Sequence, residues 1–275
     1  MEIRIAHSPD SDDAFMFYAL AKDKIATGEY HFTHRLEDIE SLNRKALQGE
    51  YEVTAISIHA YAYVAQHYAL LPSGASMGDR YGPIVVAREG LRPEDIRGRS
   101  IAIPGMMTSA YLALKLFEPD FCPMVVPFDQ IITAVERKEV DAGLLIHEGQ
   151  LTYAESGLHK VLDLGEWWHG RTGLPLPLGG NGIRRDLGPE HIREISRLIK
   201  ESIQYALDHR EAALEHSLQY ARGLTVKDAD RFVSMYVNRR TLDYGEDGRK
   251  AVRLFLAEAY DRKLIPSPAQ VEFAD

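Results

Sequence analysis

Hydrophobic and polar positions alternate at the start of the chain and then change to a helical spacing. Ile3–Ala6 alternate as in a strand, residues 7–13 are turn formers, and residues 14–21 form an apolar run typical of a helix. Residues 100–117 repeat the same order, with a short apolar strand, a polar loop and a second apolar run. A strand, a loop and a helix are therefore expected at both places.

A second pair of similar segments follows in each half of the chain. Residues 52–59 resemble residues 139–147, and both segments end in histidine. Each follows a helical stretch, at 41–47 and at 128–137. Strands separated by helical segments predict parallel sheets with crossover helices. The repetition predicts an α/β fold with two such sheets, hence two lobes and a central cleft.

Two extended stretches, 81–88 and 174–182, are expected to connect the lobes. Pro175 and Pro177 exclude a helix from the second stretch, and the glycines that follow allow close approach of the backbone to a ligand. We therefore expect one lobe to comprise residues 1–83 and 181–275. The other, residues 84–180, would be inserted into it.

The C-terminal part of the chain has helical periodicity. Pro189 suits the first turn of a helix, and isoleucines at 192, 195, 199 and 203 form one apolar stripe. Packing of this stripe against the first lobe is the expected role. Two further helices are predicted near 228–238 and 248–262.

Composition narrows the classes of partner. The chain has 32 Lys and Arg against 41 Asp and Glu, a net charge of -9, which argues against nucleic acid or an anionic membrane as the main partner. Its one cysteine excludes an intrachain disulfide. The start of the chain lacks the pattern of a signal peptide, and no apolar run could cross a bilayer. A cytoplasmic protein acting on a small molecule is expected; its oligomeric state is not indicated.

Open parallel sheets bind ligands at the carboxyl ends of their strands. The loops after the predicted strands, residues 8–13, 57–59, 104–110 and 147–150, are therefore candidates for a shared site. If the two lobes face each other, these four loops converge on the cleft. Ser8 and Asp13 of the first loop are candidate substrate-binding residues.

The loop 104–110 leads into a helix at Thr108, Ser109 and Ala110. Unpaired amide groups and the helix dipole favour an anion at such a place, and the two hydroxyls could add donors. The alternative is that Thr108 or Ser109 only caps the helix.

His147 ends an apolar strand and is the candidate for acid–base chemistry near neutral pH. The alternative is a buried histidine with a structural hydrogen bond. In the acidic turn at residues 10–13, Asp12 or Asp13 is expected to cap the next helix, and one of them could accept a hydrogen bond from a substrate hydroxyl. Trp167 and Trp168 could stack on an aromatic substrate or lie in a core.

No motif for a metal or cofactor is found. Phe15 occupies the position where a calcium loop needs glycine, and the segment after His147 lacks the second histidine of a helical zinc motif. Residues 179–182 match neither a dinucleotide fingerprint nor a phosphate-binding loop. No metal and no cofactor are therefore predicted.

At these same residues the chain resembles the menaquinone-biosynthesis proteins with a periplasmic-binding-protein-like fold (type II), and within them the 1,4-dihydroxy-6-naphthoate synthases of the futalosine pathway. The resemblance covers nearly the whole chain. It is carried by His-Ser-Pro at 7–9, Leu-Glu-Asp-Ile-Glu-Ser-Leu-Asn at 36–43, Tyr-Gly-Pro at 81–83, Ile-Pro-Gly at 103–105, Leu-Ile-His-Glu at 145–148 and Leu-Pro-Leu-Pro-Leu-Gly at 174–179.

The resemblance implies a carbon–carbon lyase that converts cyclic dehypoxanthinyl futalosine, a carboxylated substrate, to 1,4-dihydroxy-6-naphthoate. His147 matches the proton acceptor of the family. Two segments match its ligand contacts, namely Ala55, Ile56 and Ser57, and Ser109 and Ala110.

The first loop departs from the family pattern. Many members carry Ser-Pro-Cys-Pro-Asn-Asp-Thr-Phe, whereas residues 8–15 read Ser-Pro-Asp-Ser-Asp-Asp-Ala-Phe. Asp13 keeps the aspartate of the pattern, but Asp10 and Asp12 replace cysteine and asparagine. Two alternatives share the fold: chorismate dehydratase of the same pathway, and a solute-binding protein without catalytic activity.

Overall fold

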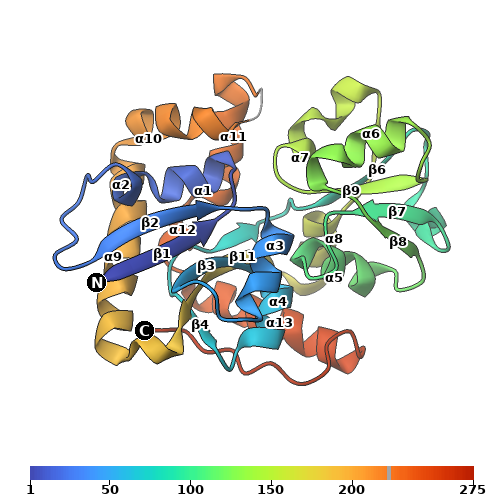
Figure 1. Ribbon diagram of the computed structural model, residues 1–275. Helices are drawn as coiled ribbons and strands as arrows, with labels where there is room; N and C mark the ends of the chain where they lie inside the picture. Colours follow the sequence, from blue (N-terminus) through green and yellow to red (C-terminus); the bar gives the residue numbers. More distant parts are fainter. Residues whose placement is uncertain (222–223) are drawn as a thin grey trace.

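The computed structural model describes residues 1–221 and 224–275 and contains two parts, each built on one β-sheet (Figure 1). The first sheet has six strands in the order β2-β1-β3-β11-β4, with β5 also paired to β11. These strands are β1 (Glu2–His7), β2 (His31–Leu36), β3 (Val53–Ser57), β4 (Tyr68–Leu70), β5 (Ser76–Gly78) and β11 (Leu176–Arg184).

The second sheet has five strands in the order β10-β6-β9-β7-β8. They are β6 (Ile84–Ala87), β7 (Ser100–Ile103), β8 (Cys122–Val125), β9 (Ala142–Leu145) and β10 (His159–Asp163). This sheet is formed by a continuous stretch that starts at Ile84. The chain returns to the first sheet at Leu176, where β11 begins and pairs with β3, β4 and β5. Residues 176–180 thus lie in the first sheet, although we expected them in the inserted lobe.

Both sheets are mixed, whereas the sequence predicted parallel ones. Strands β1, β2 and β3 are parallel, as are β7, β8 and β9. However, β11 is antiparallel to its three neighbours, and β6 is antiparallel to β9 and β10. The two exceptions are the stretches that connect the parts of the molecule. Since neither enters its sheet through a crossover helix, nothing forces it to be parallel.

Helices surround the sheets (Figure 1). The α-helices are α1 (Ser11–Met16), α2 (Tyr18–Ala21), α3 (Ile39–Ala46), α4 (Ile58–Val64), α5 (Ser109–Phe117), α6 (Ile131–Glu136), α7 (Gly149–Thr152), α8 (Leu164–Thr172), α9 (Pro189–Asp208), α10 (Arg210–Ser217), α11 (Val226–Tyr236), α12 (Arg239–Leu242) and α13 (Gly245–Asp261). Short 3₁₀ turns are η1 (Pro93–Ile96), η2 (Phe128–Gln130), η3 (Tyr153–Ser156), η4 (Arg185–Leu187) and η5 (Leu218–Tyr220). The single helix expected at 14–21 is two helices, because the backbone leaves the helical conformation at Phe17.

The apolar stripe of α9 packs on the first sheet, as its periodicity predicted. Ile195, Ile199 and Ile203 are fully buried, in one cluster with Ile3 and Ile5 of β1. Burial of each such side chain contributes roughly 1.5–3 kcal/mol to folding. Pro189 is the first residue of the helix, as expected. The stripe thus anchors the C-terminal helices to the first sheet.

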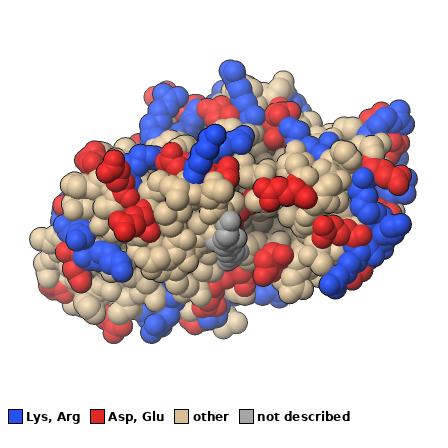
Figure 2. Space-filling view, turned by 90° about the horizontal axis from the view of Figure 1, so that it is seen from above, with Lys and Arg blue, Asp and Glu red and all other residues tan. Residues whose placement is uncertain are grey.

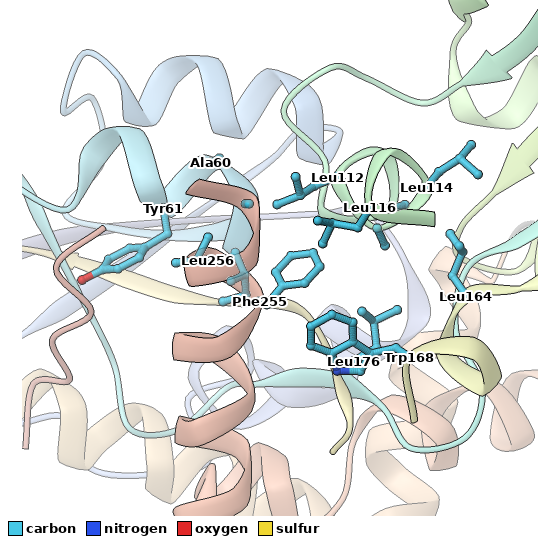
Figure 3. Packing of buried hydrophobic residues seen from close by; sticks show 14 of the residues in the cluster. Ala60, Tyr61, Leu112, Leu114, Leu116, Leu164, Trp168, Leu176, Phe255 and Leu256 are labelled. Carbon is cyan, nitrogen blue, oxygen red and sulfur yellow. The ribbon is translucent and has the colours of Figure 1, made fainter. Parts of the chain in front are cut away.

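An apolar cluster joins the two parts of the molecule (Figure 3). Leu112 and Leu116 of α5 and Trp168 of α8 lie beside the second sheet, and they meet Phe255 of α13. The Trp168 ring is fully buried and lies edge-on to Phe255 at 5.4 Å between centroids. Its indole N–H donates to the carbonyl oxygen of Pro175 at 3.1 Å. Trp168 therefore has the core role that the sequence left open.

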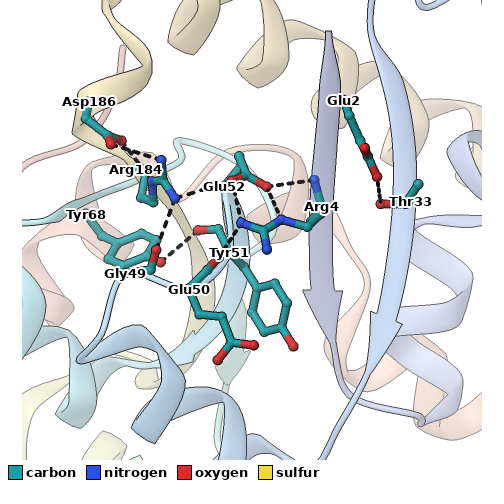
Figure 4. Close-up of polar contacts among 10 residues, drawn as sticks. All are labelled: Glu2, Arg4, Thr33, Gly49, Glu50, Tyr51, Glu52, Tyr68, Arg184 and Asp186. Carbon is teal, nitrogen blue, oxygen red and sulfur yellow. Dashed lines mark hydrogen bonds and ion pairs between the residues drawn. The ribbon is translucent and has the colours of Figure 1, made fainter.

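A polar network holds strands of the first sheet at the amino end of β1 (Figure 4). The Arg4 guanidinium donates twice to Glu52, each time at 2.8 Å, and Arg184 donates to the same carboxylate at 3.3 Å. These three residues belong to β1, to the residue before β3 and to the end of β11. The network fixes this end of the sheet, and the opposite ends of β1 and β3 are the ones that carry the candidate loops.

Candidate active site

A cleft with a volume of about 710 Å³, partly open to solvent, lies between the two parts of the molecule. All nine residues that the sequence predicted for the site line it: Ser8, Asp13, Ala55, Ile56, Ser57, Thr108, Ser109, Ala110 and His147. The first five come from the first sheet and its loops, the other four from the second. The four predicted loops therefore converge, and their residues share one cavity.

Other residues of the cleft were not expected from the sequence. Phe232 and Tyr236 of α11 and Asn181 of β11 line it, together with Leu178 and Met16. Phe232 and Tyr236 are spaced four residues apart on one helical face, and such a spacing is typical of a core and gives no signal for a site. Aromatic and aliphatic side chains thus make much of the wall, as in most pockets that bind small molecules.

His147 follows β9 and contacts the first part of the molecule. Its Nδ1 lies 2.9 Å from Oδ2 of Asp10, and its ring lies edge-on to Phe128 at 5.0 Å between centroids. The backbone at His147 has φ 53°, a left-handed conformation that side chains other than glycine seldom adopt. Such local strain is often found at functional positions.

The charge state of His147 is set by opposing effects. Burial lowers the pKa of His147, but the negative charges of Asp10, Glu148 and Asp13 and the hydrogen bond to Asp10 raise it, and the net result lies above its usual value. The side chain is 17% exposed, so a ligand in the cleft can reach it. The ring combines raised basicity with access to the cleft.

The acidic turn differs from its predicted arrangement. Asp10, not Asp12 or Asp13, caps α1, because the helix begins at Ser11 and the two later aspartates lie in its first turn. Asp10 Oδ1 accepts from the amide of Asp13 at 3.3 Å. Asp13 Oδ2 accepts from the amide of Ser8 at 2.8 Å, so one of its oxygens holds the loop. Burial and the charge of Asp10 raise the pKa values of both Asp12 and Asp13 well above the usual range.

Asp10, Asp12 and His147 place possible metal ligands within 4.8 Å of one another, as judged over the described residues. However, Nδ1 of His147 and Oδ2 of Asp10 already form a direct hydrogen bond. A cation bound by both atoms would have to break it. The arrangement fits proton sharing between a ring and a carboxylate, and we assign no metal to it.

We expect Asp12→Asn to stabilise the protein at neutral pH by roughly 1–3 kcal/mol, because a neutral amide avoids the pH-dependent cost of a buried carboxyl group whose pKa is raised. Asp12 is 7% exposed, and its Oδ1 has no hydrogen-bond partner among the described residues. Because the pKa of Asp12 is raised in the folded protein, protonated Asp12 contributes its full stabilisation below pH 3.8. This stabilisation is lost as pH rises through the pKa of Asp12 in the folded protein. Asparagine resembles the protonated acid at every pH.

Urea unfolding of both proteins between pH 3.5 and pH 8 measures this effect. The advantage of the asparagine variant should vanish at the acidic end and grow with pH. An advantage that does not depend on pH would show that ionisation of Asp12 is not its cause.

The start of α5 offers backbone donors, but its hydroxyls are occupied. Thr108 caps the helix by accepting from the amide of Tyr111 and donates its own proton to the carbonyl of Gly105. Ser109 donates to the carbonyl of Leu178 and accepts from the amide of His59. The expectation that these hydroxyls donate to a ligand is therefore wrong in this conformation.

The amides of Ser109 and Ala110 lie in the first turn of α5, where a helix has no internal acceptors for them. Both residues line the cleft, and the positive end of the helix dipole adds to their attraction for an anion. Among the described residues that line the cleft, none is lysine or arginine. An anionic ligand must therefore rely on such uncharged donors.

Ser57 supplies a hydroxyl from the facing sheet. Its amide donates to Asn43 Oδ1, and its Oγ accepts from Asn43 Nδ2, both at 2.9 Å. Because Asn43 occupies an acceptor position of the hydroxyl, its proton can point to a ligand in the cleft. His59, which follows shortly after, does not line the cleft: it lies in α4, and burial lowers its pKa to about 4.

Several hydrogen bonds cross from one part of the molecule to the other. Tyr236 donates to Oε1 of Gln150 at 2.8 Å, and the amide of Met107 donates to Glu40 at 3.0 Å. Together with the contact between His147 and Asp10 they hold the two walls of the cleft against each other. This is a closed arrangement of the cleft.

Figure 2 shows that acidic and basic side chains are interspersed over one face of the molecule, without a large region of one sign. Within the described part of the chain, no helix combines the length and the apolar character needed to span a membrane.

Known proteins show the same fold and sequence pattern. A crystal structure of an Archaeoglobus fulgidus protein is 50% identical, with a TM-score of 0.93, and the match covers 96% of this chain and 98% of that one. The alkanesulfonate-binding protein of Xanthomonas axonopodis pv. citri is 13% identical with a TM-score of 0.73, covering 98% and 96%. The latter likeness shows the fold alone and confirms that it is of the periplasmic-binding-protein type.

Two curated relatives cover nearly the whole chain. The 1,4-dihydroxy-6-naphthoate synthase of Thermus thermophilus is 43% identical over 267 residues, 97% of each chain. That of Streptomyces coelicolor is 38% identical over 271 residues, 96% of this chain and 95% of the relative. The family model described as "Menaquinone biosynthesis" matches residues 3–261. The chain therefore belongs to the menaquinone biosynthesis family whose members include these synthases.

Proposed function

We propose that the protein is a carbon–carbon lyase that converts cyclic dehypoxanthinyl futalosine to 1,4-dihydroxy-6-naphthoate, with His147 as the general base. The observation that carries the proposal is the joint position of His147 and the start of α5 in one cleft. The names of the two curated relatives supply the product. In this proposal, residues of the cleft bind the carboxylate of the substrate and take up its proton.

The carboxylate of the substrate is assigned to the start of α5. The amides of Ser109 and Ala110 and the hydroxyl of Ser57 offer donors from both sides of the cleft. Hydrogen bonds from neutral donors to a carboxylate are strong when the group is withdrawn from water. The apolar side chains of Ile56 and Leu178 then border the ring system.

The base is assigned to Nε2 of His147, because Nδ1 is engaged with Asp10. A neutral ring takes a proton from a hydroxyl of the sugar-derived portion, and the freed electron pair forms a carbonyl there as the bond to the bicycle breaks. The electron pair of the broken bond enters the ring system, and the imidazolium returns its proton to the bicycle as it becomes aromatic. The products contain all atoms and electrons of the substrate, so no oxidant or reductant is needed. Closure of the cleft excludes water and positions the substrate against the base.

The test is incubation of the purified protein with cyclic dehypoxanthinyl futalosine and, separately, with chorismate, followed by identification of the products by mass. The proposal predicts 1,4-dihydroxy-6-naphthoate from the first substrate and no conversion of the second. Dehydration of chorismate would instead assign the sister activity. Binding of either compound without turnover would leave a solute-binding protein, and each of these results contradicts the proposal.

We expect Ser57→Ala to raise KM for this substrate about tenfold or more, since a hydrogen bond to a charged group contributes about 1.5–3 kcal/mol. The value of kcat should change little, because the carboxylate is bound equally in the ground state and in the transition state. Steady-state kinetics measures both constants. Ser196→Ala, a buried serine of α9 that does not line the cleft, is the matched control. An unchanged KM in Ser57→Ala would remove this hydroxyl from the binding site.

A further inference from the structure

A buried carboxylate from the first sheet's loops contacts His147 from across the cleft. Oδ2 of Asp10 lies 2.9 Å from Nδ1 of the ring, and the Asp10 side chain is 3% exposed. We propose that Asp10 is a positioning residue for His147, which fixes the ring with its Nδ1–H on the carboxylate and leaves Nε2 as the nitrogen that takes up the substrate's proton. This inference rests on the proposed role of His147 as the base.

Asp10 is itself held in place. It caps α1, where its Oδ1 accepts from the amide of Asp13 at 3.3 Å. Burial raises the pKa of Asp10, but the charge and hydrogen bond of His147, with hydrogen bonds from Asp12 and the amide of Asp13, lower it below its usual value. The group is therefore an ionised acceptor with a fixed orientation. An acceptor of this kind on one ring nitrogen selects the tautomer of a histidine.

The groups that face His147 come from several elements. Asp10, Asp12 and Asp13 belong to the loop and first turn of α1, Glu148 is the next residue in the chain, and Tyr236 of α11 lies across the cleft near Asp12. Of these, Asp10 makes the direct contact with the ring. Asp12 and Asp13, whose pKa values are raised well above the usual range, favour their protonated forms. The Asp10 carboxylate is therefore the main negative charge that acts on the His147 ring from the opposite wall of the cleft.

The pair connects closure of the cleft with the strength of the base. Asp10 follows β1 of the first sheet and His147 follows β9 of the second, so their contact requires the closed arrangement. When the cleft opens, the ring loses the carboxylate that orients it and makes it more basic.

The experiment compares wild type with Asp10→Asn in the rate–pH profile of kcat/KM and in the NMR titration of the His147 ring. Asparagine remains a good helix cap and a hydrogen-bond acceptor but carries no charge. Since the base acts as the neutral ring, loss of the charge lowers its pKa and moves the rising limb of the profile to lower pH. The plateau should fall by about tenfold or more, because a weaker base transfers the proton less readily.

Two controls separate the possible failures. Asp38→Asn removes a carboxylate that caps α3 outside the cleft and should leave both titrations unchanged. His147→Asn identifies the ring signal among the 11 histidines by its disappearance. If His147→Asn keeps wild-type activity, the assignment of His147 as the base fails, whereas the ring titration still decides whether Asp10 contacts His147. A ring titration or a rising limb that is the same in Asp10→Asn and wild type overturns the role of Asp10.

Discussion

Replacement of His147 by asparagine is expected to lower the single-turnover rate on cyclic dehypoxanthinyl futalosine by about 10²–10⁴, the usual contribution of a general base. The reason is that asparagine cannot accept a proton near neutral pH. Asparagine is preferred here to alanine because it tolerates the left-handed backbone at this position, where φ is 53°. The variant should therefore fold like the wild type.

Single-turnover kinetics with excess enzyme isolates the chemical step from product release. Far-UV circular dichroism and thermal unfolding of the same preparation check that the fold is intact. His147→Ala serves as a second variant, and the two should agree in rate even if alanine is less stable. A rate near that of the wild type in a folded variant would end the assignment of His147 as the base.

Trp168→Ala is expected to lower the free energy of unfolding by about 3–5 kcal/mol, the range for removal of a large aromatic side chain from a core. Trp168 is fully buried in the cluster that joins the two parts of the molecule. Its loss leaves a cavity beside Phe255 and an unpaired carbonyl at Pro175. Both effects add to the lost burial of the ring.

Trp167→Ala is the matched control, because its side chain is only partly buried in the same helix. Urea unfolding followed by circular dichroism measures both variants, since replacing either of the two tryptophans alters fluorescence directly. The cost at Trp168 should be at least twice that at Trp167. Equal decreases in the free energy of unfolding would contradict the role of Trp168 in joining the two parts of the molecule.

Much of the site could be predicted from local patterns in the sequence. Short apolar strands followed by polar loops placed His147 and Ser57 at strand ends, and sheet geometry then brought these ends together. Thr108 at the start of an apolar run indicated the helix terminus. These features depend on a few neighbouring residues, so the chain alone reveals them.

Other features depend on contacts between distant segments. The partner of His147 is Asp10, 137 residues earlier in the chain, and no local pattern distinguishes it from Asp12. The hydroxyl of Ser109 is used by Leu178 and His59, so its availability follows only from the assembled cleft. The antiparallel strands β6 and β11 likewise depend on how the two parts connect. In each case tertiary structure decides what the sequence leaves open.

The central claim is that one substrate contacts both His147 and the start of α5. A crystal structure of His147→Asn with unreacted cyclic dehypoxanthinyl futalosine tests it most directly. We predict the carboxylate within hydrogen-bond distance of the amides of Ser109 and Ala110, with the sugar-derived portion beside residue 147. A carboxylate bound elsewhere, or a substrate that does not touch residue 147, would contradict the account.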